Sequence, residues 1–126
     1  MKDKYLMSDP PFDSMDTSVL LATVSHGGLL QRTRTWAALC RRVRSEPNLS
    51  DKVLKIIISD EARGSRIFGL VTMSHVLIAC LWSFGGDDEH KRLKQLISQW
   101  GDATDRETLI WYLREEDIPI NEKAVE

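Results

Sequence analysis

Few side chains in this sequence are placed for chemical catalysis. The three histidines, His26, His75 and His90, lie in three separate parts of the chain, and no spacing suggests a Ser-His-Asp or Cys-His grouping. The sequence also contains no glycine-rich phosphate loop, no HExxH motif and no paired-carboxylate motif. We therefore expect no enzymatic activity and no cofactor.

The two cysteines do not form a metal-binding or disulfide pattern. Cys40 and Cys80 stand forty residues apart, with no CxxC pair and no histidine at ligand spacing. We expect both to be small apolar core residues in a reducing compartment. No metal site is predicted.

Five arginines within thirteen residues are the densest group of cations. Such a cluster on a helix could contact phosphates, but no aromatic or glycine-rich partner accompanies it, so we favour a solvated helix face. The formal net charge is -2 and the pI is about 5.9, which gives no general attraction to nucleic acid or to an anionic membrane. Nucleic-acid binding is kept only as an alternative. The five residues are Arg32, Arg34, Arg41, Arg42 and Arg44.

The longest apolar stretch, residues 67–86, contains no Asp, Glu, Lys or Arg. A helix of this composition is apolar on every side and must be surrounded by protein or by lipid. About 20 apolar residues are enough to cross a bilayer, but glycine, serine and threonine dilute this stretch. We therefore favour a buried central helix, with His75 in a core or groove position, over a transmembrane helix.

The rest of the chain predicts further helices around this centre. Apolar residues recur at helical spacing, and glycine or proline separates the segments. The prediction is an all-α fold of six to seven helices packed around a central hydrophobic helix, in a single domain over residues 14–126. A loose arm is expected over residues 1–13, because Pro10 and Pro11 interrupt a helix there. The other helices are expected over residues 14–26, 29–45, 51–62, 90–100 and 105–116, with Ser50 as an N-cap and Thr104 opening a capping box with Glu107.

The two ends of the chain are polar. The first residues carry acidic side chains where a secretion signal would be apolar, and the last ten offer no apolar tail anchor. We expect a soluble, cytoplasmic protein without a transmembrane anchor.

Residues 78–86, with the sequence IACLWSFGG, match an apolar stretch that ends in Phe-Gly-Gly in the Bcl-two (B-cell lymphoma two) family of apoptosis regulators. Residues 67–68 are similar to the helix end that precedes that family's first homology region, and residues 74–77 stand where Asn-Trp-Gly-Arg would stand. Residues 111–113 look like a reduced second homology region that lacks Gly-Gly-Trp. Such abbreviated regions, together with the polar C-terminus, resemble viral members of the family, including those of iridoviruses.

The family's third homology region has two candidate positions. Residues 21–26 have its leucine spacing, with His26 in place of the usual Asp. Alternatively, residues 14–26 are the family's first helix and the arginine-rich residues 29–45 are its groove-forming second helix. We prefer the second assignment, because it leaves enough chain for a first helix.

The resemblance implies a viral anti-apoptotic protein that sequesters the amphipathic helix of pro-apoptotic Bcl-family ligands, such as a Bim-like helix, in a hydrophobic groove. It would act in the host cytoplasm, with peripheral association with mitochondria. The residues that the resemblance assigns to the groove, each with ordinary core packing as its alternative, are Arg32, Trp36, Leu39, Ile67, Phe68, Ser74, His75, Leu77 and Phe84.

Leu77 is the main departure from the family pattern. The family's arginine at this position pairs with a ligand aspartate, so its loss predicts weaker or narrower ligand selection. His75, Arg63 or Arg66 are candidates to replace it. A function of a different class is a dimeric helical scaffold, or an antagonist of an immune-signalling adaptor, that uses the outer surface of the same fold.

Overall fold

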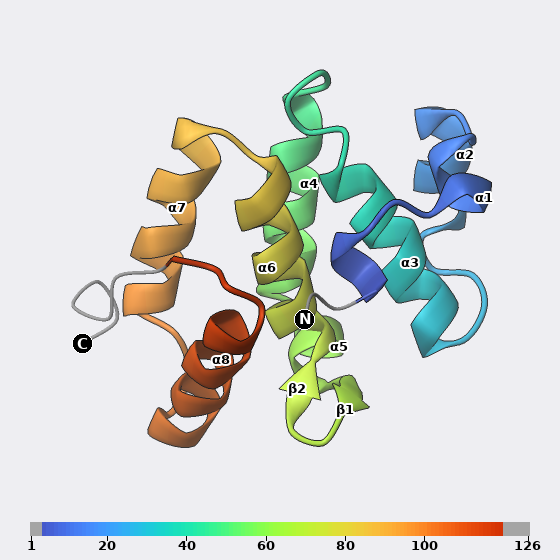
Figure 1. Cartoon of the computed structure of the whole chain (residues 1–126). Helices are drawn as coiled ribbons and strands as arrows, with labels where there is room; N and C mark the ends of the chain where they lie inside the picture. Colours follow the sequence, from blue (N-terminus) through green and yellow to red (C-terminus); the bar gives the residue numbers. More distant parts are fainter. Residues whose placement is uncertain (1–3, 120–126) are drawn as a thin grey trace.

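Residues 4–119 are described by a computed structural model, and within them the chain forms the expected all-α fold, with one two-stranded sheet (Figure 1). A short 3-10 helix, η1 (Lys4–Leu6), comes first. The remaining elements are α1 (Pro10–Asp13), α2 (Thr17–Thr23), α3 (Leu29–Cys40), α4 (Asn48–Ile57), α5 (Asp60–Gly64), β1 (Arg66–Phe68), β2 (Val71–Thr72), α6 (Met73–Phe84), α7 (Asp87–Ser98) and α8 (Ala103–Glu115).

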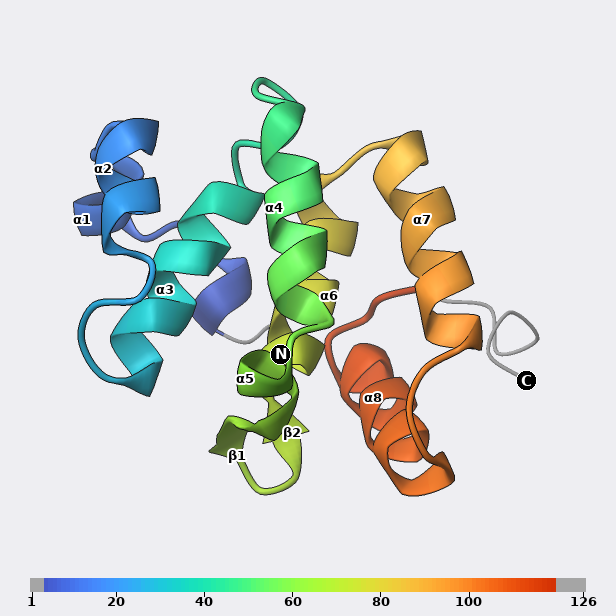
Figure 2. The same ribbon diagram turned by 180° about the vertical axis from the view of Figure 1, so that it is seen from behind.

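The predicted central helix exists as α6. Every residue from Met73 to Trp82 is buried, and α6 packs against α3, α4, α5, α7, α8 and η1. In both views it lies in the middle of the molecule, between α3 on one side and α7 on the other (Figures 1 and 2). An apolar helix therefore avoids water because other helices surround it.

The first third of the predicted central helix is not helical. Residues 66–72 form an antiparallel hairpin, in which Gly69 has φ of +51° in the two-residue loop between the strands. A positive φ is what such loops require and what glycine adopts without strain. The expectation of one helix over residues 67–86 is wrong for residues 67–72.

A capping box sets the first residue of α6. The Thr72 hydroxyl oxygen accepts a hydrogen bond from the backbone N–H of His75 at 3.4 Å, and His75 Nδ1 accepts one from the N–H of Thr72 at 3.2 Å. These bonds satisfy backbone donors that a helix start leaves unpaired. The hairpin therefore ends where the cap begins.

Gly85 connects α6 to α7 through a close approach. A Cβ atom at this position would lie 2.6 Å from the carbonyl oxygen of Leu81 and 2.6 Å from the side chain of Glu89. The neighbouring Gly86 donates its N–H to Glu89 Oε1 at 2.7 Å, at the start of α7. The glycine pair that carries the family resemblance thus has a local structural role in this chain.

Two other predicted helix starts are wrong. Ser50 does not cap the fourth helix; it lies inside α4, buried. The segment 51–62 is split by Ser59, whose hydroxyl caps α5 by accepting from the N–H of Ala62. Helix α8 starts before Thr104, since Asp102 is its N-cap and accepts from the N–H of Asp105.

The N-terminal segment is folded rather than loose over its described part. The side chains of Tyr5, Leu6 and Phe12 are buried, and η1 packs against α3 and α6. Pro10 and Pro11 occupy the first turn of α1, where the missing N–H groups cost nothing. The prolines start a helix here instead of preventing one.

None of the helices within residues 4–119 has the length and apolar content needed to span a bilayer. Helix α6 has 12 residues, which at 1.5 Å per residue is roughly 18 Å, against a hydrocarbon core of about 30 Å.

Candidate functional site

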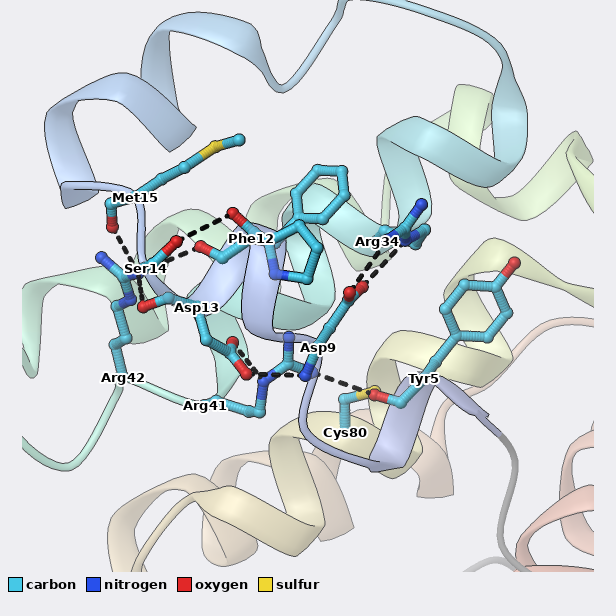
Figure 3. A network of polar contacts seen from close by, with 11 residues as sticks. Tyr5, Asp9, Phe12, Asp13, Ser14, Met15, Arg34, Arg41, Arg42 and Cys80 are labelled. Carbon is cyan, nitrogen blue, oxygen red and sulfur yellow. Dashed lines mark hydrogen bonds and ion pairs between the residues drawn. The ribbon is translucent and has the colours of Figure 1, made fainter.

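Arg34 on α3, together with Arg41 and Arg42 just after this helix, holds the N-terminal segment (Figure 3). Arg34 donates from Nε and Nη2 to the two carboxylate oxygens of Asp9, each at 2.8 Å. Hydrogen bonding to Arg34 lowers the pKa of Asp9, and the same contact raises the pKa of Arg34. This bidentate pair ties the segment before α1 to α3.

The side chain of Arg42 binds the same N-terminal segment, mainly at backbone carbonyl oxygens. Its Nη2 donates to the carbonyl oxygens of Phe12 at 3.3 Å, Asp13 at 3.0 Å and Met15, and its Nη1 donates to the Thr17 hydroxyl at 3.0 Å. The carbonyl oxygen of Phe12 also accepts from the backbone N–H of Met15, and Arg42 adds a second donor to this group of carbonyl oxygens after α1, so it acts as a side-chain cap.

The three remaining arginines are also engaged within the chain. Arg41 donates from Nε to Asp13 Oδ1 at 2.8 Å, Arg44 donates to the carbonyl oxygen of Gly85 at 2.9 Å, and Arg32 pairs with Glu61 of α5. These arginines are partly exposed, as expected, but each also binds a group of the same chain. Phosphate groups of a nucleic acid would have to displace these contacts.

Four residues assigned to the groove are fully buried. Leu39, Ser74, His75 and Leu77 each have 0% of their surface exposed. The Ser74 hydroxyl donates to the carbonyl oxygen of Ile57 at 2.6 Å, within the core. Because no solvent reaches these side chains, their assignment to the wall of an open groove is wrong.

His75 belongs to a polar cluster between α6 and α8. Since Nδ1 accepts from Thr72, the ring proton lies on Nε2, which donates to Asp105 Oδ1 at 2.7 Å. Asp105 Oδ2 accepts from the Trp100 indole N–H at 2.7 Å, and the Arg63 guanidinium lies 4.6 Å from the centre of the Trp100 ring. Both ring nitrogens of His75 are thus occupied by protein groups.

Burial lowers the pKa of His75 below its usual value. The carboxylate of Asp105 acts in the opposite direction, whereas the positive charge of Arg63 adds to the lowering. A buried, neutral imidazole without a free nitrogen has no lone pair to offer a substrate. Its role here is to cap α6 and to join it to α8.

The other assigned residues do not converge on one site. Ile67 and Phe68 lie on β1, and Phe68 is 45% exposed beside Tyr112, with 5.9 Å between ring centres. Phe84 is half-buried at the opposite end of α6. Of the nine assigned residues, Trp36 lines an open groove and Arg32 lies one turn before it on α3.

That groove runs between α2, α3 and α4 and has a volume of about 420 Å³. Leu21 and Val24 form one wall, the edge of Trp36 contributes from α3, and Ile56 contributes from α4. Leu21, Val24 and Ile56 are half-buried and pack against the core. The floor of the groove is therefore apolar, continuous with the core and open to solvent.

Two lysines of α4 stand at the rim of this groove. Lys52 and Lys55 are exposed and line it, one helical turn apart, and neither forms an ion pair or hydrogen bond with the described residues. Residues three apart lie on the same helix face. The site thus combines an apolar floor with two available positive charges.

Sequence reasoning missed both lysines. Their signal was present, since Lys52 and Lys55 share helical spacing with Ile56 and Ser59 at the end of an amphipathic helix. The spacing could not predict which helix lies next to α4, because α2 brings Leu21 and Val24 alongside α4 only in the folded chain.

A second apolar depression, also of about 420 Å³, lies between the hairpin and α8. Phe68, Leu70 and Trp111 line it with 45%, 53% and 51% of their surfaces exposed, and Glu107 stands beside them. Exposed aromatic and aliphatic side chains that lie together are typical of an interaction surface.

Within residues 4–119 no three side chains of His, Cys, Asp or Glu are grouped to hold a metal ion. Comparison with models of known protein families, with curated proteins and with solved structures gave no match to this chain.

Proposed function

We propose that this protein binds an amphipathic helix of a partner protein in the groove between α2, α3 and α4. Following the resemblance to the Bcl-two family, the partner is the helix of a pro-apoptotic ligand, and the protein acts as a viral inhibitor of apoptosis in the host cytoplasm. The observation that carries the proposal is the apolar groove with two unpaired lysines at its rim.

The groove fits the two faces of such a helix. Apolar side chains at i, i+3 or i+4, and i+7 would enter between Leu21, Trp36 and Ile56. An acidic residue on the flank of the same helix would lie near Lys52 or Lys55. These lysines would supply the positive charge that the family places at the position of Leu77, which is buried here.

Isothermal titration calorimetry tests the proposal. The full chain is titrated with a panel of pro-apoptotic helix peptides, including a Bim-like one, and with a copy of each peptide in which the acidic residue is replaced by alanine. We expect at least one peptide to bind, and its alanine copy to bind several-fold more weakly, because exposed ion pairs contribute about 0.2–1 kcal/mol.

A matched pair of double variants locates the contact. Lys52→Glu with Lys55→Glu reverses the charge at the groove, whereas Lys91→Glu with Lys94→Glu makes the same change at the same spacing on α7. The first variant should lose affinity and the second should keep it. Absence of binding by every peptide, or equal loss in both variants, would contradict the proposal.

A second candidate function is a dimeric scaffold, favoured by the depression between the hairpin and α8. In both views β1 is the outer strand of the hairpin, while β2 faces α8 (Figures 1 and 2). The exposed side chains of Phe68, Leu70 and Trp111 are suited to a second copy of this chain, since the same apolar patch on two copies can meet about a twofold axis.

Sedimentation velocity tests the scaffold function. The unmodified chain should sediment as a dimer at tens of micromolar, and Trp111→Glu should shift it to a monomer. Leu30→Glu changes an equally exposed leucine on α3, far from the hairpin in sequence, and should leave the dimer intact. A monomer at all concentrations would exclude this function and leave the groove proposal standing.

A further inference from the structure

A small polar pocket lies where the N-terminal segment meets α3. Its volume is about 250 Å³, and the residues that line it are Lys4, Tyr5, Ser8, Asp9, Arg34, Ala37 and Arg41. It is separate from the groove between α2, α3 and α4, with which it shares no lining residue.

The pocket carries an excess of positive charge. Lys4, Arg34 and Arg41 face one lining carboxylate, that of Asp9, and Asp13 pairs with Arg41 from outside the pocket. Counting both carboxylates, one positive charge remains unbalanced. A phosphate monoester carries about -1.5 to -2 charges at pH 7, so it would find net attraction here.

Donors for such a group are left over from the existing contacts. Arg41 uses Nε for Asp13 and Nη1 for the Tyr5 carbonyl oxygen, while its buried Nη2 has no hydrogen-bond partner. Arg34 uses Nε and Nη2 for Asp9. The Lys4 ammonium lies 5.3 Å from the centre of the Tyr5 ring and forms no ion pair with the described residues.

Ser8 lines the same pocket and is accessible to an enzyme. It is exposed, it lies in the irregular segment between η1 and α1, and its hydroxyl forms no hydrogen bond with the described residues. A protein kinase binds its substrate serine in an extended segment, so η1 and α1, each no longer than about one turn, would unwind locally for the kinase.

We propose that Ser8 is a phosphorylation site whose phosphate group binds in the pocket formed by Lys4, Arg34 and Arg41. The phosphoryl donor is a nucleoside triphosphate held by a protein kinase. The bond between the terminal phosphorus and its bridging oxygen breaks, a bond from that phosphorus to Ser8 Oγ forms, and the hydroxyl proton passes to a base of the kinase. The nucleoside diphosphate leaves.

The consequence is a firmer attachment of the N-terminal segment. The phosphate oxygens accept hydrogen bonds from α3 and from Lys4, so they add a bridge next to the one between Asp9 and Arg34. The same segment continues into α2, which forms one wall of the groove. The site itself does not depend on what the groove binds.

Phosphorus NMR of two singly phosphorylated proteins tests this proposal. One carries phosphoserine at Ser8 and the other at Ser25, an exposed residue after α2 that lines none of the pockets described above. We expect the second phosphate pKa at Ser8 to lie about half a unit or more below that at Ser25, because nearby cations favour the dianion. Lys4→Gln, a change at an exposed residue, should reduce the difference.

Equal titration of the two phosphates would overturn the proposal, and so would a difference that Lys4→Gln leaves unchanged. Adding inorganic phosphate at about 10 mM to the unmodified protein shows whether the pocket binds only a phosphate attached to Ser8 or also a free anion. Attachment raises the effective phosphate concentration, so the free ion should cause no saturable shift of the Ser8 and Ala37 amides. Saturable shifts combined with equal titration of the two phosphoserines would mean that the pocket takes a free anion instead.

Discussion

The arginines of α3 and of the turns that follow it are bound within the fold, whereas the lysines of α4 at the groove are not. All five arginines between residues 32 and 44 bind groups of the same chain, mostly carboxylates and carbonyl oxygens of the N-terminal segment. The two lysines at the groove, Lys52 and Lys55, bind none of the described residues. The denser cluster serves the fold, and the sparser pair is the one available to a partner.

The difference teaches that the number of charges in a stretch of sequence does not locate a binding site. Arginine presents five N–H donors in a rigid plane, which suits it to fixing several carbonyl oxygens at once, as Arg42 does. Lysine is a single, well-hydrated charge on a flexible stem, and it stays in solvent at a rim without cost. Four predictions test this division, taken from the largest expected effect to the smallest.

Placing a cation at position 77 should unfold the protein. Leu77→Arg buries an unpaired charge in a side-chain position with 0% exposure, so we expect a loss of more than about 4 kcal/mol in the free energy of unfolding. Urea denaturation measures it, with Leu30→Arg, at a half-exposed position, as the control that should change little. A folded Leu77→Arg protein with tighter peptide binding would restore position 77 to the groove.

Removing an arginine from the turn after α3 should cost stability, while removing an α4 lysine should not. Arg42→Ala removes the side-chain donor to the carbonyl oxygens of Phe12, Asp13 and Met15. We expect a loss of about 2–3 kcal/mol, since hydrogen bonds to charged groups contribute about 1.5–3 kcal/mol. Lys52→Ala should stay within about 0.5 kcal/mol of the unmodified protein. Thermal denaturation measures both variants, and an equal loss of stability in the two would contradict the difference proposed between the arginines and the lysines.

Acid should weaken the link between α6 and α8. The pKa of His75 is lowered in the folded protein, so the unfolded chain binds the proton more readily, and stability falls as pH drops below about 6.5. Urea midpoints between about pH 7.5 and about pH 5.5 report this slope. His75→Asn should flatten it and His26→Gln, at an exposed residue, should not. If the stability of His75→Asn depended on pH as strongly as that of the unmodified protein, the pH dependence would come from another titrating group.

Salt should weaken peptide binding slightly, and through the lysines alone. Exposed ion pairs are screened, so raising NaCl from about 50 to about 500 mM should reduce affinity by a factor of up to about 5. The double variant Lys52→Glu with Lys55→Glu should lose this dependence, while the double variant on α7 should keep it. Calorimetry at the two salt concentrations gives the comparison, and identical dependence in all three proteins would place the charge contact elsewhere.

Much of the fold could be predicted, because the strongest signal in the sequence is the distribution of charged and apolar residues along the chain. An uncharged stretch has to be buried, which located α6, and helical spacing located α3, α7 and α8. The hairpin was missed because apolar content outweighed two local signals, Gly69 in a loop and the cap formed by Thr72 and His75. The folded N-terminal segment was missed because its partners lie on α3, some 25 to 30 residues away along the chain.

The site was harder to predict than the fold. Assignment by resemblance placed Leu39, Ser74, His75 and Leu77 on a groove wall, but the last three lie inside α6, which is buried on every side, and Leu39 lies on the buried side of α3. Trp36 was assigned to a groove walled by residues 67–77, and in the structure it lines a different groove, between α2, α3 and α4. Its neighbours Leu21, Val24, Lys52 and Lys55 become visible only when three helices are placed together.

The central claim is that a helix binds between α2, α3 and α4, and amide chemical-shift mapping tests it most directly. The peptide that binds best in calorimetry is added to the isotopically labelled full chain. The account predicts that the largest shifts fall at Leu21, Val24, Lys55 and Ile56, around the groove. Largest shifts at Phe68, Leu70 and Trp111, beside the hairpin, would contradict it.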